Sequence, residues 1–290
     1  MLTSGLFTTH RVEIEVEIGK PIKLIPFGDV HRDSHLHAGS HWREFLDYAK
    51  RQKNAVFLGM GDYSDGVSTS ERIILSDHGL HDTTTRNLGD VYKGVAKTLI
   101  NELSFMRGRL LGMVGGNHYF RFEDGSTTDH QIAAALGAKF LGVCSFLRLS
   151  LNPKGRGKSV ALDIFAHHGK GGGNTPGGQF GSIEKMLSTA DADIYLMGHS
   201  HGKGCIPSTP RIRLVTATHS KAVSVVERTP WLGRTGSFLK AYEPGEVSYN
   251  VDAARSPCAL GWIEFELTVV RNRSRDDGYD DLRVQIRGTS

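Results

Sequence analysis

Short apolar runs alternate with segments of helical spacing over the first two thirds of the chain. Residues 11–18 alternate Val and Ile with charged residues, which predicts a half-exposed strand. Residues 41–52, 83–108 and 127–137 have apolar side chains three and four residues apart, which predicts covering helices. Between these segments lie compact apolar runs that predict interior strands: IKLIPF, NAVFLGMG, RLLGMVGG, SVALDIFAH and ADIYLMG. The alternation predicts a layered α/β domain.

The pattern changes after residue 205. Strand-like pieces follow one another there, separated by Pro and Gly: RIRLVTATH, AVSVVE and LGWIEFELTVV. Because no linker composition marks a boundary, we expect a single domain over residues 1–290, with a metal-site core at about 22–205 and a strand-rich part of the second sheet at about 206–290. The glycine-rich segment 169–181 is predicted to be a mobile loop beside the site.

Composition narrows the class of protein only slightly. Of 290 residues, 39% are hydrophobic and 23% are charged, as in ordinary globular domains. The net charge of +4 permits an anionic partner without requiring one. Three cysteines lie far apart without CxxC spacing, which disfavours a disulfide framework or a structural zinc knuckle. No secretory signal and no apolar run of membrane-spanning length is visible, so we expect a cytoplasmic protein without a membrane partner.

Each of the five interior strands is followed by side chains that can bind a metal ion or orient another side chain at the site. They are Asp29 and His31, then Asp62 and Asp65, then Asn117 and His118, then His167 and His168, and finally His199 and His201. A single Asp or His after a strand is more simply explained as a helix cap or a turn residue. Five successive occurrences, always with glycine close by, are hard to explain by capping alone. Because the strands of one sheet bring their carboxyl ends together, we expect these side chains to converge on one edge.

The residue types indicate which ions such a site would bind. Imidazole, carboxylate and amide groups without thiolate suit divalent Mn, Fe, Zn or Co. Two carboxylates, one amide and at least four histidines exceed the four ligands of a mononuclear zinc site. The count therefore predicts two divalent metal ions.

The ordered blocks GDVH, GDYSD, GNH, HH and GHSH, within residues 28–201, resemble the signature blocks of the calcineurin-like metallophosphoesterase superfamily. The resemblance implies a four-layer α/β sandwich, in which two packed mixed β-sheets are flanked by helices. By the same resemblance, the first metal would be held by Asp29, His31 and His201, and the second by Asn117, His199 and one of the pair His167 and His168. Asp62 would bridge the two ions, His118 would be the catalytic histidine, and Asp65 would orient it. Relatives with two adjacent histidines mostly use the first, which favours His167 over His168.

The resemblance implies a dinuclear metal-dependent phosphoesterase that hydrolyses its substrate through a metal-bridging hydroxide, with Mn as the favoured ion. A phosphodiesterase is the preferred reading, with a nucleic acid or a nucleotide among the candidate substrates. A phosphomonoesterase or protein phosphatase is the alternative enzyme. A metal-binding scaffold without turnover is the alternative from another class, which the intact His118 and the full ligand set disfavour.

Four residues are candidate substrate contacts: Tyr119, Arg121, Lys170 and His35. Tyr119 stands where many relatives have Asp or Glu, and with Arg121 it could form an aromatic and basic patch that stacks a base and binds phosphate. The competing interpretation places Phe120 and Phe122 in the core and leaves Arg121 exposed.

Overall fold

The computed structural model describes residues 7–79, 81–155, 158–171, 173, 175–216, 223–246, 249–252, 254, 256–273 and 280–290. The strands are β1 (Thr8–Val16), β2 (Pro21–Phe27), β3 (Ala55–Gly59), β4 (Leu110–Met113), β5 (Cys144–Pro153), β6 (Val160–His167), β7 (Ile194–Met197), β8 (Lys203–Pro207), β9 (Arg211–Thr216), β10 (Val223–Arg228), β11 (Trp231–Thr235), β12 (Glu264–Arg273) and β13 (Asp280–Thr289). The helices are α1 (Gly39–Arg51), α2 (Thr69–His78), α3 (Asp82–Leu103), α4 (Thr128–Leu136), α5 (Pro176–Glu184) and α6 (Tyr249–Asp252), with 3₁₀ turns η1 (Ser104–Met106) and η2 (Lys185–Ser188).

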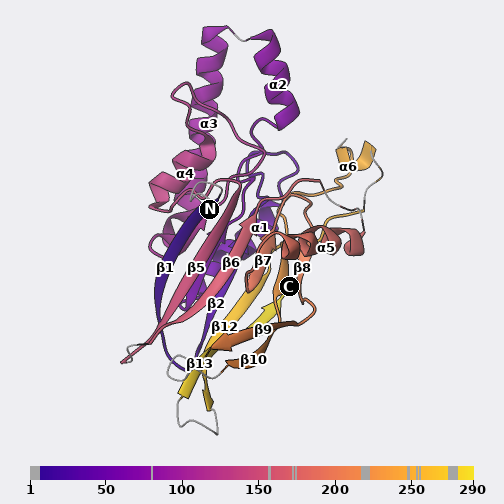
Figure 1. The fold of residues 1–290 in the computed structure, drawn as a ribbon. Helices are drawn as coiled ribbons and strands as arrows, with labels where there is room; N and C mark the ends of the chain where they lie inside the picture. The colour runs from indigo at the N-terminus through magenta and orange to yellow at the C-terminus, as the bar shows by residue number, and fades with distance from the viewer. Residues whose placement is uncertain are drawn as a thin grey trace.

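Two large mixed sheets form the body of the molecule (Figure 1). One has six strands in the order β1-β5-β6-β7-β11-β8, and the other has five in the order β13-β12-β2-β3-β4. In the five-stranded sheet β2, β3 and β4 run parallel, whereas β12 pairs with β2 in the antiparallel direction. The α/β architecture of two packed mixed sheets flanked by helices, expected from the resemblance, is confirmed.

The two sheets pack face to face through one apolar cluster. Alternate residues of each strand point to opposite faces of its sheet. Leu24 and Leu58 of the five-stranded sheet therefore meet Ile164 and Leu196 of the six-stranded sheet in the layer between them. All four side chains are 0% exposed. This shared layer fixes the carboxyl ends of the strands from both sheets relative to one another.

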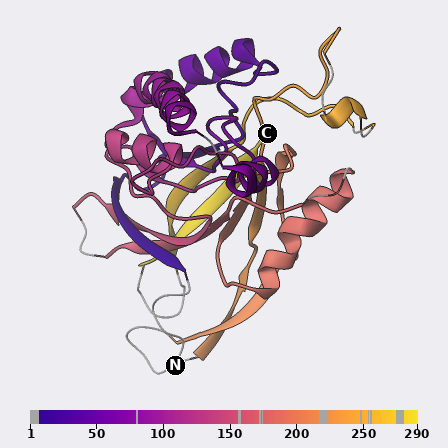
Figure 2. The same ribbon diagram turned by 90° about the horizontal axis from the view of Figure 1, so that it is seen from above.

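Helices cover the two outer faces of the sandwich (Figure 2). Trp42 and Phe45 of α1, with Leu99 of α3, pack on the outer face of the five-stranded sheet. Leu99 belongs to an apolar stripe of α3, in which buried residues recur at three-, four- and seven-residue spacing. On the opposite side, Ile183 of α5 packs against Phe165 of the six-stranded sheet. Within the described residues, no helix is both long enough and apolar enough to cross a bilayer.

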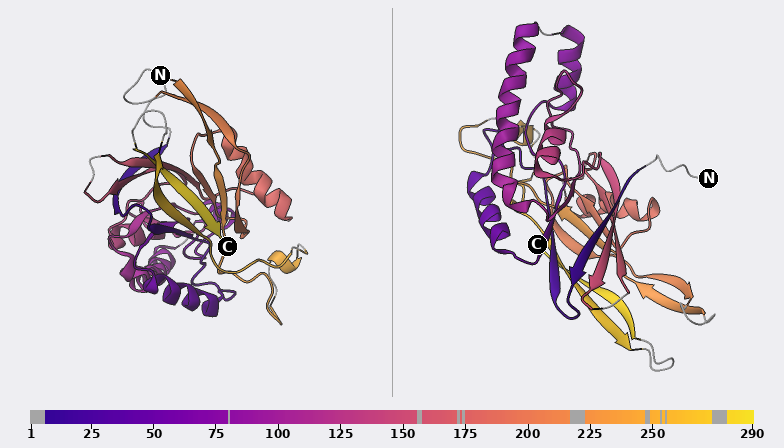
Figure 3. Two further views of the ribbon diagram at one scale, coloured as in Figure 1. Left: turned by 90° about the horizontal axis from the view of Figure 1, so that it is seen from below. Right: turned by 90° about the vertical axis from the view of Figure 1, so that its left-hand side faces the viewer.

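Helices α2 and α3 project as a pair from one end of the sandwich, whereas the β9–β10 hairpin lies at the other end (Figures 1 and 3). Helix α2 begins with a capping box, in which Ser68 and Glu71 satisfy each other's backbone N–H groups. No apolar periodicity predicted this helix. The end with α2 is also the end at which β2, β3 and β4 terminate.

The structure corrects two expectations about the later part of the chain. The strands after residue 205 do not complete one second sheet: β8 and β11 join the six-stranded sheet, β12 and β13 join the five-stranded sheet, and β9 and β10 pair separately. Residues 217–222, part of the predicted strands there, lie outside the described residues. The glycine-rich segment 169–181 is not a loop throughout, because α5 begins at Pro176, with Thr175 as its N-cap.

Candidate metal centre

The candidate ligands lie just after strands of both sheets. Asp29 and His31 follow β2, and Asp62 and Asn117 follow β3 and β4 of the five-stranded sheet. The remaining histidines follow β6 and β7 of the six-stranded sheet. The convergence is therefore confirmed, but it involves two sheets rather than the single sheet edge expected from the sequence.

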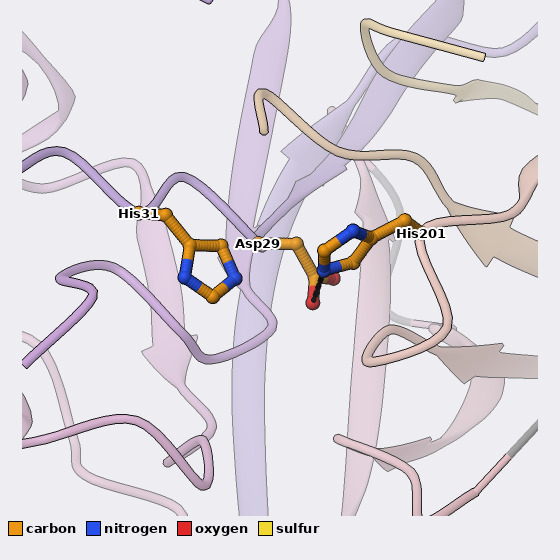
Figure 4. A group of neighbouring side chains, drawn as sticks. All are labelled: Asp29, His31 and His201. Carbon is orange, nitrogen blue, oxygen red and sulfur yellow. Dashed lines mark ion pairs between the residues drawn. The ribbon is translucent and has the colours of Figure 1, made fainter. Parts of the chain in front are cut away.

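A first group consists of Asp29, His31 and His201, whose ligand atoms lie within 4.8 Å of one another. Figure 4 shows the Asp29 carboxylate between the two imidazoles. The Nε2 atom of His201 is 3.6 Å from Asp29 Oδ1. The backbone N–H of His199 donates to both oxygens of Asp29, at 3.0 and 3.1 Å, which fixes the orientation of the carboxylate.

A second group consists of Asp62, His168 and His199, whose ligand atoms also lie within 4.8 Å of one another. Asn117 completes it: its Oδ1 is 3.0 Å from His168 Nε2 and 2.7 Å from His199 Nδ1. Carboxylate, amide oxygen and imidazole thus gather around one point.

Asp62 belongs to the second group, also faces the first, and is 1% exposed. Its Oδ2 is 3.2 Å from His168 Nε2 in the second group and 3.8 Å from His31 Nε2 in the first. Its Oδ1 accepts the backbone N–H groups of Asn117 and His118, each at 2.8 Å. One oxygen therefore braces the GNH loop, while the other faces both groups.

The backbone at the site is unusual for non-glycine residues. Among the described residues, six that are not glycine have positive φ, and five of these are candidate ligands: Asp29 (47°), His31 (44°), Asp62 (51°), His199 (66°) and His201 (56°). Such a conformation costs on the order of 1 kcal/mol or more per residue and persists only where the surroundings enforce it. The neighbouring glycine at 116 is required for another reason, since a Cβ there would lie 2.0 Å from Asp62 Oδ1.

Burial and mutual charge set the protonation of the cluster. Burial raises the pKa of Asp29 to about 6. Burial alone would also raise the pKa of Asp62, but the charge and hydrogen bond of His168 lower it. Burial would lower the pKa of His168, but Asp62 raises it to about 9. Burial, aided by neighbouring imidazolium charge, lowers the pKa of His199 to about 4 and of His201 to about 3. His199 and His201 are therefore neutral donors at pH 7, whereas His168 must release a proton to bind a cation.

The residues fit the divalent ions that the sequence predicted. His31 Nδ1 is 2.7 Å from Asp65 Oδ1, which leaves Nε2 as the coordinating atom. That Nε2 is buried without a hydrogen-bond partner and lies 3.8 Å from Asp62 Oδ2. A buried polar atom without a partner costs about 1–3 kcal/mol, and a cation at this position would remove that cost. Two sets of oxygen and nitrogen donor atoms that share Asp62 suit two borderline or hard cations.

The geometry distinguishes the two adjacent histidines. His168, not His167, faces Asp62, Asn117 and His199. His167 is the last residue of β6, and its Nδ1 accepts the backbone N–H of Gly169 at 2.7 Å. Because successive residues at a strand end point to opposite sides, only one of the two can reach the cluster.

His118 is oriented mainly by the backbone of Asp65 rather than by its carboxylate. His118 Nδ1 donates to the carbonyl oxygen of Asp65 at 2.8 Å, whereas the nearest carboxylate oxygen is 3.6 Å away. A carbonyl can only accept, so Nδ1 has the proton and Nε2 is the nitrogen available for chemistry. The Asp65 carboxylate instead makes its short contact with His31.

Of the four predicted substrate contacts, only His35 lines the pocket beside the cluster. The Arg72 guanidinium lies 3.8 Å from the Tyr119 ring centroid, and it donates to the carbonyls of Asn117 and Tyr119 at 3.1 and 3.4 Å and to that of Val67. Arg121 is exposed and the phenylalanines on either side of it are buried, as in the competing interpretation. Neither Tyr119, Arg121 nor Lys170 lines the described pocket.

The pocket has a volume of about 930 Å³. His31, Asp62, His118, His199 and His201 line it together with residues that the sequence did not single out: Gln179, Phe180, Lys203, Leu239, Pro257 and Cys258. Cys258 Sγ lies 3.9 Å from His201 Nδ1. Lys203 directly follows the GHSHG segment, so proximity to a motif could have indicated it. Gln179 and Phe180 belong to the glycine-rich segment 169–181, which the sequence predicted to lie beside the site. Leu239, Pro257 and Cys258 come from distant segments, and no pattern in the sequence marks them.

Comparisons with known proteins give only distant likenesses. No family model and no curated protein matches the chain. Among solved structures, Vps29 complexed with Zn²⁺ from Entamoeba histolytica is similar at 12% identity, covering 91% of this chain and 99% of that chain, with a TM-score of 0.39. A single mutant of Vps29 from the same organism is similar at 13% identity, covering 93% and 100% of the two chains, with a TM-score of 0.36. Likenesses of this size assign no function to the chain.

Proposed function

We propose that this chain is a dinuclear metal-dependent phosphoesterase that hydrolyses phosphodiesters. The observation behind the proposal is Asp62, whose Oδ2 faces both ligand groups while its Oδ1 is fixed by two backbone N–H groups. A short, anionic and oriented side chain between two groups of donors is what a shared cation pair requires.

Asp29, His31 and His201 would hold one ion and Asn117, His168 and His199 the other, with Asp62 common to both. When bound, such a pair supplies charge stabilisation at the phosphoryl oxygens and activation of water at neutral pH. Manganese is the ion we propose.

His118 is the residue of this chain that we propose acts on the substrate directly. Its Nδ1 is held by the Asp65 carbonyl and its ring lines the pocket, so in the imidazolium form, with a proton on each nitrogen, Nε2 would donate its proton to the departing ester oxygen and leave the neutral ring protonated at Nδ1. General-acid catalysis of this kind typically contributes about 10²–10⁴-fold to the rate. Asp65 fixes both His31 and His118, so it positions residues at the metal centre and at the leaving group.

Turnover of two chromogenic esters tests the proposal. Bis(p-nitrophenyl) phosphate and p-nitrophenyl phosphate are compared after reconstitution with Mn, Zn, Fe or Co, and again after chelation. Faster hydrolysis of the diester, lost on chelation and restored by metal, is the expected result. A preference for the monoester would make the chain a phosphomonoesterase, and no hydrolysis of either ester with two ions bound would leave a metal-binding scaffold.

A further inference from the structure

Part of the pocket lining contributes neither candidate metal ligands nor His118. It includes Pro176 and Phe180 from α5, Leu239 from the segment after β11, and Pro257 from the segment before β12, and we call these four residues the apolar wall. These side chains are apolar, and they come from three separate segments of the chain. At about 930 Å³, the pocket is near the upper end of the range of about 300–1,000 Å³ for small-molecule sites. It is therefore larger than a phosphate group at the metal centre needs.

Phe180 is the largest apolar side chain on this wall, and its position is fixed. A Cβ at Gly204 would lie 3.1 Å from Phe180 Cζ, so the ring edge rests against the backbone of β8. Ile183, about one helical turn further along α5, is fully buried and anchors the helix to the sheet. A half-buried ring held in this way offers a flat apolar surface with little conformational freedom to lose on binding.

The charge of the pocket limits the class of substrate. Among the described residues that line it, Lys203 is the only lysine or arginine. The Lys203 side chain packs against the backbone at two glycines. A Cβ atom at Gly236 would lie 3.3 Å from Lys203 Cγ, and a Cβ atom at Gly261 would lie 3.6 Å from Lys203 Nζ. Within the described part of the chain, the Lys203 ammonium group has no hydrogen-bond or ion-pair partner. Proteins that follow a nucleic-acid backbone use several Lys or Arg contacts to successive phosphates. A single lysine matches the one negative charge of a phosphodiester.

We infer that the substrate is a small phosphodiester with a flat, uncharged arm, bound with that arm against Phe180 and its single negative charge beside Lys203. The inference rests on the proposed function, which it narrows from phosphodiesters in general to small organic ones. It also replaces the stacking patch predicted at Tyr119 and Arg121 with the apolar wall, in which Phe180 of α5 has the largest side chain.

Two diesters with the same leaving group test the role of Phe180. Bis(p-nitrophenyl) phosphate and methyl p-nitrophenyl phosphate both release p-nitrophenol and differ in the arm that remains. The metal-loaded chain is expected to prefer the aromatic arm in kcat/KM, and Phe180→Ala to reduce that preference about fivefold to tenfold. Lys203→Gln is expected to lower kcat/KM for both diesters about tenfold and leave the preference unchanged. Ile212→Ala, at a side chain 79% exposed on β9, is the control and should change neither value.

Calorimetric binding of diphenyl phosphate and dimethyl phosphate gives a readout that does not depend on turnover. The aromatic diester is expected to bind more tightly to the wild-type chain, and Phe180→Ala to remove most of the difference. An unchanged preference in Phe180→Ala would overturn the inference, as would a single-stranded oligonucleotide hydrolysed faster than either diester with a steep loss of rate in salt. If no ester is hydrolysed but the Phe180-dependent binding preference is present, the proposed function fails and the assignment of the wall as a binding surface stands.

Discussion

Asp62 uses its two oxygens for different purposes. One accepts two backbone N–H groups and the other faces histidines of both ligand groups. The substitution Asp62→Asn keeps the shape of the side chain but removes its negative charge. We expect the metal content, measured by elemental analysis after dialysis, to fall from two ions per chain to fewer than one, with loss of turnover. Two ions retained in this variant would contradict a shared ligand at this position.

His118 is expected to behave in the opposite way. His118→Ala removes a side chain that lines the pocket and lies close to His31 and Asp65, but that we do not propose as a ligand of either ion. The variant should therefore retain two ions and lose about 10²–10⁴-fold in kcat. Comparable kcat values for the variant and the wild-type chain, both fully loaded with metal, would remove His118 from the mechanism.

The adjacent histidines provide a matched pair of variants. His168→Ala removes a proposed ligand that also contacts Asp62 and Asn117. His167→Ala removes only a local hydrogen bond to Gly169. We expect His168→Ala to lower the affinity for one ion by at least tenfold, as titrated calorimetrically, and His167→Ala to leave it within about twofold. Equal losses in both variants would mean that the cluster tolerates either residue.

Most site residues could be predicted because their chemical types recur after successive strands. The choice within the histidine pair could not, since it depends on the register of β6 in its sheet. A shift of the register by one residue reverses which side chain faces the cluster, and no pattern in the sequence specifies the register that closely. The short contact of the Asp65 carboxylate with His31 could likewise not be predicted, because it depends on how two separate loops pack.

At the scale of elements, α2 supports the loop that contains His118. Arg72 on α2 donates to the carbonyls of Asn117, Tyr119 and Val67 and covers the Tyr119 ring. We expect Arg72→Ala to lower the free energy of unfolding by about 2 kcal/mol, measured by urea denaturation, because charged donors contribute about 1.5–3 kcal/mol. Arg86→Ala, at an exposed position on α3, should change it by less than about 0.5 kcal/mol. An equal effect of both variants would show that Arg72 does not brace the loop.

The helices differ in how clearly the sequence predicted them. Apolar side chains at regular spacing predicted α1, α3 and α4. Residues 176–181, the larger part of α5, were predicted to be loop because PGGQFGSIE contains three glycines and a proline, which disfavour helix formation in isolation. Its helical conformation depends on tertiary packing, since Ile183 is fully buried against the six-stranded sheet. Helix α2 was missed because Ile73, Ile74 and Leu75 are consecutive rather than spaced along one face.

At the scale of the whole molecule, the layered architecture followed from alternating apolar runs, but the assignment of strands to sheets did not. Periodicity shows that a strand is buried on both faces and does not show which strands are its neighbours. The strands β8, β11, β12 and β13 therefore divide between the two sheets in a way that no local pattern specified.

Because the ligands follow strands of both sheets, bound ions should stabilise the packing of one sheet on the other. A ligand that binds only the folded state adds about 2.7 kcal/mol of stability at one hundred times its dissociation constant. We expect chelation to lower the thermal unfolding temperature of the wild-type chain by several degrees and to have a smaller effect on Asp62→Asn. An unfolding temperature that does not respond to metal in the wild-type chain would show that the ions do not bridge the sandwich.

The order of the ligands along the chain also affects biosynthesis. His199 and His201 come from one short loop, yet each belongs to a different group, so neither group is complete until that loop has left the ribosome. A nascent chain that ends before residue 199 has only partial donor sets from the earlier loops. Acquisition of the two cations that we propose is thus deferred until roughly two thirds of the polypeptide has been synthesised.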